Sequence, residues 1–170
     1  VGRFTDQKDQ ITLLKAINLI KNKISLQLTI VGRGKEEENL KKFINNNNLN
    51  GLVRLVNFTN NPYNLINSSD IFILSSLYEG LPNVLLESQV LKKFIISTNC
   101  PTGPKEILMN GKAGFLFKPK DYKNLAKLII YAYKNKSKLK KMSNLGYKNL
   151  FRFDYNTNIK KYYSTINSIL

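Results

Sequence analysis

Histidine is absent from this sequence, and Cys100 is its only cysteine. A serine-histidine-aspartate triad needs an imidazole, and the usual structural zinc sites need several cysteine or histidine ligands, so neither can be assembled from this chain. A lone thiol cannot form a disulfide within the chain. Without a neighbouring base, Cys100 is interpreted as a small buried residue rather than a nucleophile. We therefore expect chemistry without imidazole, and a cytoplasmic setting.

Long apolar runs are also missing. None approaches the roughly 20 residues that a bilayer-spanning helix needs, and Val1-Gly2-Arg3-Phe4 does not begin the charged-then-apolar pattern of a signal peptide. A length of 170 residues, 42% of them hydrophobic, suffices for one domain with a real core. We expect a single domain over residues 1–170, excised from a longer protein because the sequence lacks an initiator methionine.

Acidic residues are scarce: 11 stand against 27 lysines and arginines, which gives a net charge of +16. This charge would attract phosphate on a nucleotide, a nucleic acid or an anionic membrane surface. The alternative is a compositional bias of the whole genome, since lysine greatly outnumbers arginine and the chain is rich in asparagine, isoleucine and tyrosine. Co-sedimentation of the full-length protein with anionic vesicles at low salt would distinguish peripheral binding to the inner face of the cell membrane from such a bias.

Two patterns alternate along the chain. Short apolar runs bounded by glycine, proline, asparagine or aspartate predict five strands, at residues 26–31, 52–58, 71–74, 94–97 and 114–117. Apolar residues at helical spacing predict helices at residues 11–19, 36–46, from Pro82 onward, 122–133 and 156–170. A short helix is also predicted to start at Lys105, after the turn at residues 100–104. The alternation favours a doubly wound α/β domain, with a mostly parallel sheet flanked by helices. In such a sheet, ligands bind beyond the carboxyl ends of the strands.

Gly32 and Gly34 lie in a loop between a predicted strand and a predicted helix. Backbone N–H groups in such a loop can approach a phosphate at the positive end of a helix. A dinucleotide fingerprint would need a third glycine at position 37, where the chain has Glu37, so a nicotinamide cofactor is not expected. The alternative is a tight turn in which the glycines only supply a positive φ.

Arg3 and Lys8 flank the first loop, just after Val1-Gly2, which looks like the end of a strand. Two cations at the end of a strand suit a phosphate ligand. In a chain with 27 basic residues, composition alone nevertheless favours ordinary surface positions for both.

Two glutamates lie close to the end of the strand predicted at residues 71–74. Glu79 is in the turn, and Glu87 is about one and a half helical turns beyond Pro82, so both carboxylates can meet one ligand at the edge of the sheet. Paired acids also carry out glycosidase chemistry, in which one protonates and the other attacks or activates water. Alternatively, each glutamate only interacts with the N-terminus of a helix, or lies on a solvated face.

A resemblance to a known family lies in residues 76–87, SLYEGLPNVLLE. This segment resembles the paired-glutamate motif of retaining glycosyltransferases with two Rossmann-like domains, the GT-B enzymes of glycosyl transferases group 1. Seven residues separate the two glutamates, as in that family. The order of the flanking motifs is also similar and covers nearly the whole chain: residues 2–4 with Lys8, residues 30–34, residues 101–108 and residues 111–114.

The resemblance implies a C-terminal, donor-binding half of such an enzyme, without its N-terminal acceptor domain. Arg3 and Lys8 would neutralise the diphosphate as it leaves, Glu79 would bond hydroxyls of the donor sugar, and Glu87 would bind the ribose hydroxyls. Backbone amides would hold the sugar and the phosphates; the donor-binding positions are Gly32, Gly34, Gly80, Leu81, Asn83 and Val84. No metal is expected. The family retains the anomeric configuration, and the leaving phosphate helps to deprotonate the acceptor, so the missing histidine is no obstacle.

Two departures from the family pattern bear on donor preference: Pro82 stands where glycine is common, and Ser88 where alanine is common. Residues 99–104 resemble bacterial enzymes that add hexoses or N-acetylhexosamines to lipid-linked or surface glycans, which favours a UDP-linked donor. The expected function is transfer of such a sugar, with retention, to a glycan or lipid-linked acceptor. The missing domain would supply most of the acceptor pocket, so the chain alone is expected to bind donor but to be inactive.

Two other functions are considered. A sugar-nucleotide epimerase of the same fold would bind the same donor, but it relies on acid-base groups that this chain does not obviously supply. A basic nucleic-acid-binding module is the alternative from another class; no known reader motif is present and the aromatic residues follow core periodicity, so nucleic acid is not an expected partner. Titration with UDP and with a single-stranded oligonucleotide distinguishes these classes.

Overall fold

Short strands alternate with helices along the chain in this computed structural model, which describes residues 1–169. The strands are β1 (Leu28–Val31), β2 (Val53–Val56), β3 (Ile71–Leu74), β4 (Phe94–Thr98) and β5 (Phe115–Phe117). The α-helices are α1 (Gln10–Ile20), α2 (Glu37–Asn46), α3 (Tyr63–Asn67), α4 (Asn83–Val90), α5 (Pro104–Ile107), α6 (Tyr122–Lys134), α7 (Lys136–Lys148) and α8 (Tyr155–Asn167). Three 3-10 turns are η1 (Asp6–Lys8), η2 (Met109–Gly111) and η3 (Leu150–Phe153).

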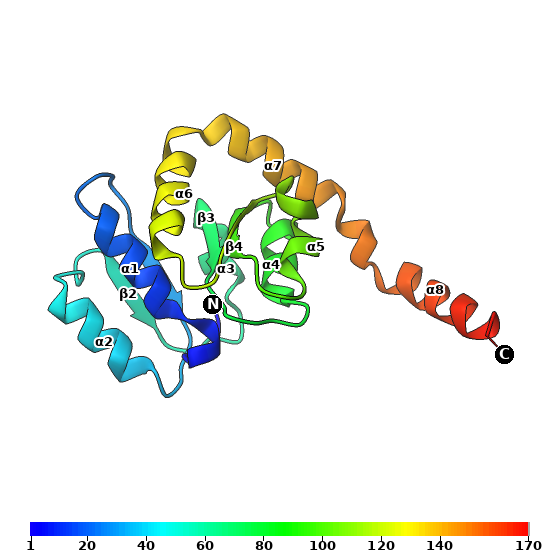
Figure 1. The fold of residues 1–170 in the computed structure, drawn as a ribbon, viewed down its shortest axis with the longest axis horizontal. Coiled ribbons are helices and arrows are strands. Elements are labelled where there is room, and N and C mark those ends of the chain that lie inside the picture. The colour runs from blue at the N-terminus through cyan, green and yellow to red at the C-terminus, as the bar shows by residue number, and fades with distance from the viewer. Residues whose placement is uncertain (170) are drawn as a thin grey trace.

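The predicted fold class is confirmed: parallel strands lie between helices on both faces, in a Rossmann-like α/β arrangement (Figure 1). All five predicted strands are present. The difference is that the strands form two sheets. β1 pairs with β2, with Leu28 opposite Val53, whereas β3, β4 and β5 form a separate parallel sheet with Ile71 opposite Phe94.

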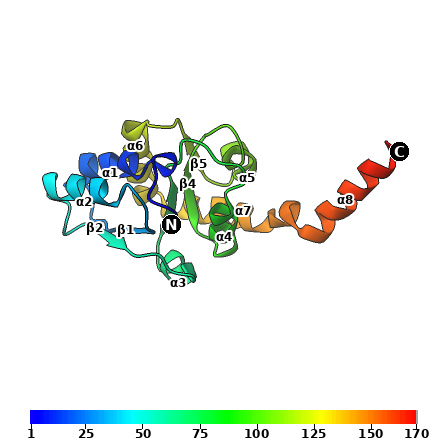
Figure 2. The ribbon, with the colours of Figure 1, turned by 90° about the horizontal axis from the view of Figure 1, so that it is seen from below.

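The two faces of the strands carry separate hydrophobic cores. On one face, α1 and α6 lie together and bury residues such as Leu14, Ile17 and Leu125 (Figure 2). On the other face, α3, α4 and α5 pack on β3 and β4 around Leu85, Ile95 and similar residues; this smaller core contains Ile66, Phe72, Leu74, Leu85, Ile95, Ile107 and Leu108. Burial on both faces is typical of a doubly wound domain.

Aspartate caps fix the starts of three helices. Asp9 precedes α1 and accepts from the backbone N–H of Thr12; Asp121 does the same for α6, and Asp154 for α8. A side-chain oxygen at this position satisfies one of the N–H groups that a helix start leaves without a partner. Each cap therefore sets where its helix begins.

Two helices were not predicted, and one prediction reaches beyond the described residues. The missed helices are the short α3 and the lysine-rich α7, which continues after a break at Asn135. The predicted helix at 156–170 is α8, with Leu170 outside the described residues. α8 projects away from the body, with no fully buried side chain and with Tyr155, Tyr162 and Tyr163 exposed (Figure 2). No helix among residues 1–169 is sufficiently long and apolar to span a membrane.

The packing of α1 on α6 gives a direct test of the larger core. Leu14 is completely buried, whereas Leu19 on the same helix is 44% exposed. We expect Leu14→Ala to lower the free energy of unfolding by about 2–5 kcal/mol, because it removes buried methyl groups and leaves a cavity. Leu19→Ala is the matched control and should cost less than about 1 kcal/mol. Urea unfolding measures both, and equal losses would contradict the assigned packing.

Candidate functional site

The first residues of the chain lie along the carboxyl end of β1. The N–H of Gly2 donates to the carbonyl of Val31 over 2.9 Å, and the N–H of Phe4 donates to the carbonyl of Arg33 over 2.9 Å. The Phe4 side chain is buried in the larger core and anchors the segment. This arrangement places the loop with Arg3 and Lys8 beside the loop that follows β1.

The glycines after β1 make this close approach possible. A Cβ atom at Gly32 would overlap the carbonyl oxygen of Gly2, and one at Gly34 would overlap that of Phe4. Glycine is therefore required at both positions for more than a tight turn, because a second backbone segment occupies the space that a side chain would fill. Their predicted contact with a phosphate stays a prediction.

Lys8 and Glu79, 71 residues apart in sequence, form an ion pair with Nζ to Oε1 at 2.7 Å. Their side chains are 20% and 8% exposed, so the pair is largely shielded from water. Backbone contacts hold the two segments together: the N–H of Leu77 donates to the carbonyl of Gln7 over 2.8 Å, and Ser75 Oγ donates to the carbonyl of Lys8 over 2.8 Å. Two of the predicted site residues therefore meet directly.

The turn with Glu79 is also held from the loop after β4. Thr102 Oγ1 donates to the carbonyl of Glu79, and Thr98 Oγ1 donates to the carbonyl of Ser76 over 2.7 Å. Gly103 has a φ of +85°, and a Cβ there would overlap the carbonyl of Gly80. Sequence reasoning placed this loop near the ligand but did not identify Thr102 as the group that fixes Glu79. Its position between two prolines, Pro101 and Pro104, was the available signal.

The start of α4 faces the same edge. Pro82 was predicted as the first helical residue, but its ψ of 95° is extended and the helix begins at Asn83. Gly80, Leu81 and Asn83 are exposed. The backbone N–H groups of Asn83 and Val84 have no acceptor within the helix, because a helix leaves its first amides free. These amides carry the partial positive charge of the helix end, as an anion site requires.

Glu87 lies on α4 and is half-buried. Burial and, to a smaller extent, the charge of Lys8 lower the pKa of the Val1 amino group to about 6, and the charge of Glu87 acts in the opposite direction. Both charges therefore lie within electrostatic reach of one atom. The structure brings Lys8, Glu79 and Glu87 to one edge of the strands.

Arg3 stands apart from this group. Its side chain is exposed and makes no ion pair with any of residues 1–169. Its carbonyl accepts from Gln10 Nε2 over 2.9 Å and from the N–H of Thr5 over 3.1 Å. An unpaired guanidinium keeps all five of its donors for a ligand.

Cys100 is buried beside this edge, and burial raises the pKa of its thiol. A raised pKa leaves the residue protonated, which agrees with its interpretation as a packing residue. Among the described residues, no three histidine, cysteine, aspartate or glutamate side chains come together as a metal site would require.

Comparisons with known proteins identify a family for most of the chain. The model of the family described as "Glycosyl transferases group 1" matches residues 1–149. An uncharacterised glycosyltransferase of Methanocaldococcus jannaschii is 38% identical over 133 residues, covering 70% of this chain and 33% of that protein. A second relative, from Campylobacter jejuni, is 32% identical over 116 residues, covering 68% of this chain and 31% of that protein. It is the N-acetylgalactosamine-N,N'-diacetylbacillosaminyl-diphospho-undecaprenol 4-alpha-N-acetylgalactosaminyltransferase.

Solved structures have the same fold. The crystal structure of Alr3699/HepE of Anabaena in complex with UDP superimposes with a TM-score of 0.88 at 21% identity, covering 98% of this chain and 47% of that one. The chain spans about a third of the length of the two curated relatives.

The close backbone approach at Gly32 can be tested by substitution. We expect Gly32→Ala to lower the free energy of unfolding by about 1–3 kcal/mol, because the new Cβ would displace the segment at Gly2. Gly51→Ala is the matched control, since a Cβ there would meet no atom within 4 Å. Its effect should stay within about 0.5 kcal/mol. Denaturant unfolding compares the two, and an unchanged stability of the Gly32 variant would contradict the described approach.

Proposed function

Since the chain belongs to the family Glycosyl transferases group 1, we propose that it is the donor-binding half of a longer glycosyltransferase. The observation that carries the proposal is the shielded ion pair of Lys8 and Glu79, which lies at the carboxyl ends of the strands beside the free amides of α4. Ligands of doubly wound domains bind at this edge. At this edge, cations that can bind a diphosphate lie beside groups that can accept hydrogen bonds from hydroxyl groups.

The ion pair leaves both partners with capacity for a ligand. Lys8 has three N–H donors and uses one on Glu79, so two remain for phosphate oxygens. Glu79 accepts through Oε1, and its second oxygen can accept from a sugar hydroxyl. Because water is largely excluded, these interactions are stronger than they would be on an open surface.

The proposed chemistry is cleavage of the bond between the anomeric carbon and the diphosphate oxygen. Both bonding electrons leave with the diphosphate, and the sugar becomes cationic. Arg3, Lys8 and the first amides of α4 would stabilise the growing negative charge. The acceptor hydroxyl then bonds to the anomeric carbon, and its proton passes to the leaving phosphate. In this scheme the glutamates bind hydroxyls and transfer no proton, and the configuration is retained.

The relatives support the choice of donor and acceptor. The Anabaena structure was solved with UDP, and the Campylobacter relative is named for transfer of N-acetylgalactosamine to an undecaprenol-linked glycan. We therefore propose a UDP-linked hexose or N-acetylhexosamine as donor and a glycan or lipid-linked acceptor, bound mainly by another part of the protein. Nucleotide release from a panel of sugar nucleotides would identify the donor.

Replacing the cations tests the assignment of the leaving group. In the longer enzyme we expect Lys8→Met and Arg3→Ala each to slow turnover about a hundredfold or more, as loss of one transition-state donor costs about 3 kcal/mol of barrier. Lys127→Ala, an exposed lysine on α6, is the control and should keep normal turnover. Wild-type turnover in both cation variants would refute the assignment.

A double variant separates catalysis from stability. Lys8→Met leaves Glu79 shielded from water without its partner, which should lower the unfolding temperature. Adding Glu79→Gln removes that unpaired charge, so the double variant should recover unfolding temperature but not turnover. Recovery of both would mean that the pair is only structural.

The proposed role of Glu87 predicts a change in nucleotide selectivity. If its carboxylate accepts from the ribose hydroxyls, calorimetric titration of this chain should show tighter binding of UDP than of 2'-deoxy-UDP. Glu87→Ala should weaken the binding of UDP by about tenfold, which is the range for loss of a hydrogen bond to a charged group. The affinity for 2'-deoxy-UDP should change less. Glu38→Ala, at an exposed glutamate on α2, is the control. An equal loss of affinity for both nucleotides would contradict a contact between Glu87 and the ribose hydroxyls.

A further inference from the structure

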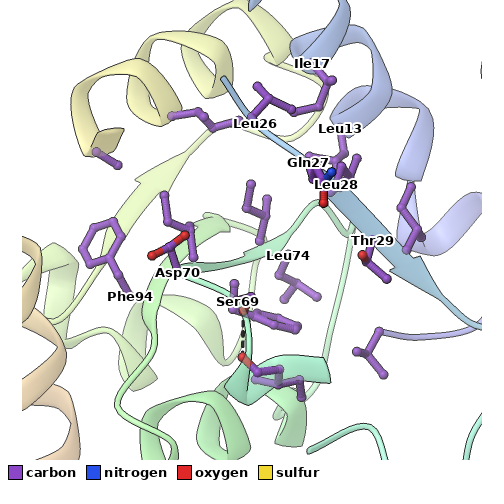
Figure 3. Close-up of a pocket in the computed structure, with 18 of the residues that line it drawn as sticks. Leu13, Ile17, Leu26, Gln27, Leu28, Thr29, Ser69, Asp70, Leu74 and Phe94 are labelled. Carbon is purple, nitrogen blue, oxygen red and sulfur yellow. Dashed lines mark hydrogen bonds between the residues drawn. The ribbon is translucent and has the colours of Figure 1, made fainter. Parts of the chain in front are cut away.

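The turn that carries Glu79 follows β3, and a cleft of about 660 Å³ separates β3 from β1. Leu28 lines one wall of this cleft and Leu74 lines the other (Figure 3). The bonds that reach the turn from this side come from η1; for example, Gln7 Nε2 donates to the carbonyl of Tyr78 over 3.0 Å. A void adds no packing contacts to the atoms that line it. Much of the support for Glu79 therefore comes from the other side, where β3 pairs with β4.

The support on the side of β4 includes a single turn of helix. α5 has only four residues, Pro104–Ile107, and begins directly after Gly103. The loop before it holds the turn: Thr102 Oγ1 donates to the carbonyl of Glu79, and Gly103 lies against the carbonyl of Gly80. A helix this short is not stable by itself. The position of the loop therefore depends on what fixes the other end of α5.

The other end of α5 is bonded to an arginine that lies 45 residues beyond it in sequence. Arg152 is in η3; its Nη1 donates to the carbonyl of Glu106 and its Nη2 to the carbonyl of Ile107, each over 3.3 Å. The last carbonyls of a helix have no partner within it and carry its partial negative charge. A guanidinium presents two donors side by side, so it satisfies two such carbonyls at once. The ring of Phe153 lies 5.0 Å from the guanidinium and holds it by a cation-π contact.

The carbonyl of Ile107 also connects α5 to α4. Gln89, which is 2% exposed, donates from Nε2 to this carbonyl over 3.2 Å. Glu87 lies on α4 two residues before Gln89. On the outer side, Asn158 in the first turn of α8 donates from Nδ2 to the carbonyl of Arg152 over 2.9 Å. One peptide group thus joins the two helices next to the site to η3, which is itself bonded to α8.

We propose that Arg152 is a positioning residue of the donor site, which fixes the end of α5 and, through α5, the turn at Glu79. This inference rests on the proposed function, in which Glu79 binds hydroxyls of the donor sugar. Without Arg152, α5 would be held less firmly and Thr102 could no longer keep Glu79 in place. Small displacements of the groups that bind a substrate reduce the rate strongly. Glu87 is less affected, because α4 is anchored by its own buried residues.

The first test uses the longer enzyme, with the sugar nucleotide from which it releases nucleotide fastest. We expect Arg152→Met to lower kcat about tenfold or more, because Glu79 is displaced. Inhibition by UDP, which has no sugar for Glu79 to bind, should stay within about twofold of normal. Arg152→Lys keeps the positive charge without the planar fork and should recover part of the turnover. Arg54→Met, at an exposed arginine on β2, is the matched control and should keep normal turnover.

A second test shows whether Arg152 acts through α5. Thr102→Val breaks the link to the carbonyl of Glu79. Combined with Arg152→Met, it should give an enzyme no slower than the Thr102 variant alone, because both changes interrupt one path. In the present chain, the N–H groups of Ile107 and Leu108 are bonded within α5. Arg152→Met should speed their hydrogen exchange about tenfold.

The possible failures are distinguishable. Normal kcat in Arg152→Met, with normal inhibition by UDP, would overturn the role of Arg152 and leave the proposed function intact. Equal losses of turnover and of UDP affinity, or losses that multiply in the double variant, would also overturn it, because they would mean that Arg152 does not act through Glu79. An unaltered enzyme that neither binds UDP nor releases nucleotide from any donor would refute the proposed function, and the donor-site role of Arg152 with it.

Discussion

The approach of two backbones at the end of β1 is the constraint on which the site depends. Gly2 and Phe4 bond to the carbonyls of Val31 and Arg33 because Gly32 and Gly34 have no side chains to prevent it. This contact directs the chain into η1, which ends at Lys8, and Gln7 and Lys8 are then bonded to the segment after β3. A lysine from the first turn thereby reaches a glutamate 71 residues away.

The ion pair that results is a compromise between stability and function. Two charges largely withdrawn from water lose hydration, and their attraction offsets this loss only when the geometry is good. Apolar residues of similar size would often be at least as stable. The charged pair therefore makes more sense as a preorganised site for a ligand with both phosphate and hydroxyl groups than as a stabilising contact. Thr102 and Gly103 support it by fixing the turn at Glu79 and Gly80.

Local patterns sufficed to predict much of this fold and part of the site. Each strand is a short, mostly apolar run bounded by turn residues, and its boundaries were found within three residues. α7 was missed because its sequence is dominated by lysine, so few apolar residues mark its buried side. The pairing of Lys8 with Glu79 could not be derived from spacing, since it depends on how the strands are ordered. The break between β1 and β3 could not be predicted either, because strand patterns carry no information about which edges meet.

The break also bears on how the site is held. Lys8 and Glu79 approach from opposite sides of this break: the segment of Lys8 is bonded to the end of β1, and Glu79 follows β3. The relative position of β1 and β3 rests on helix packing and on contacts of η1 with residues 75–78. Since a displacement of about 1 Å can reduce catalysis a hundredfold, these contacts bear directly on the fixed geometry that transfer from a diphosphate sugar requires.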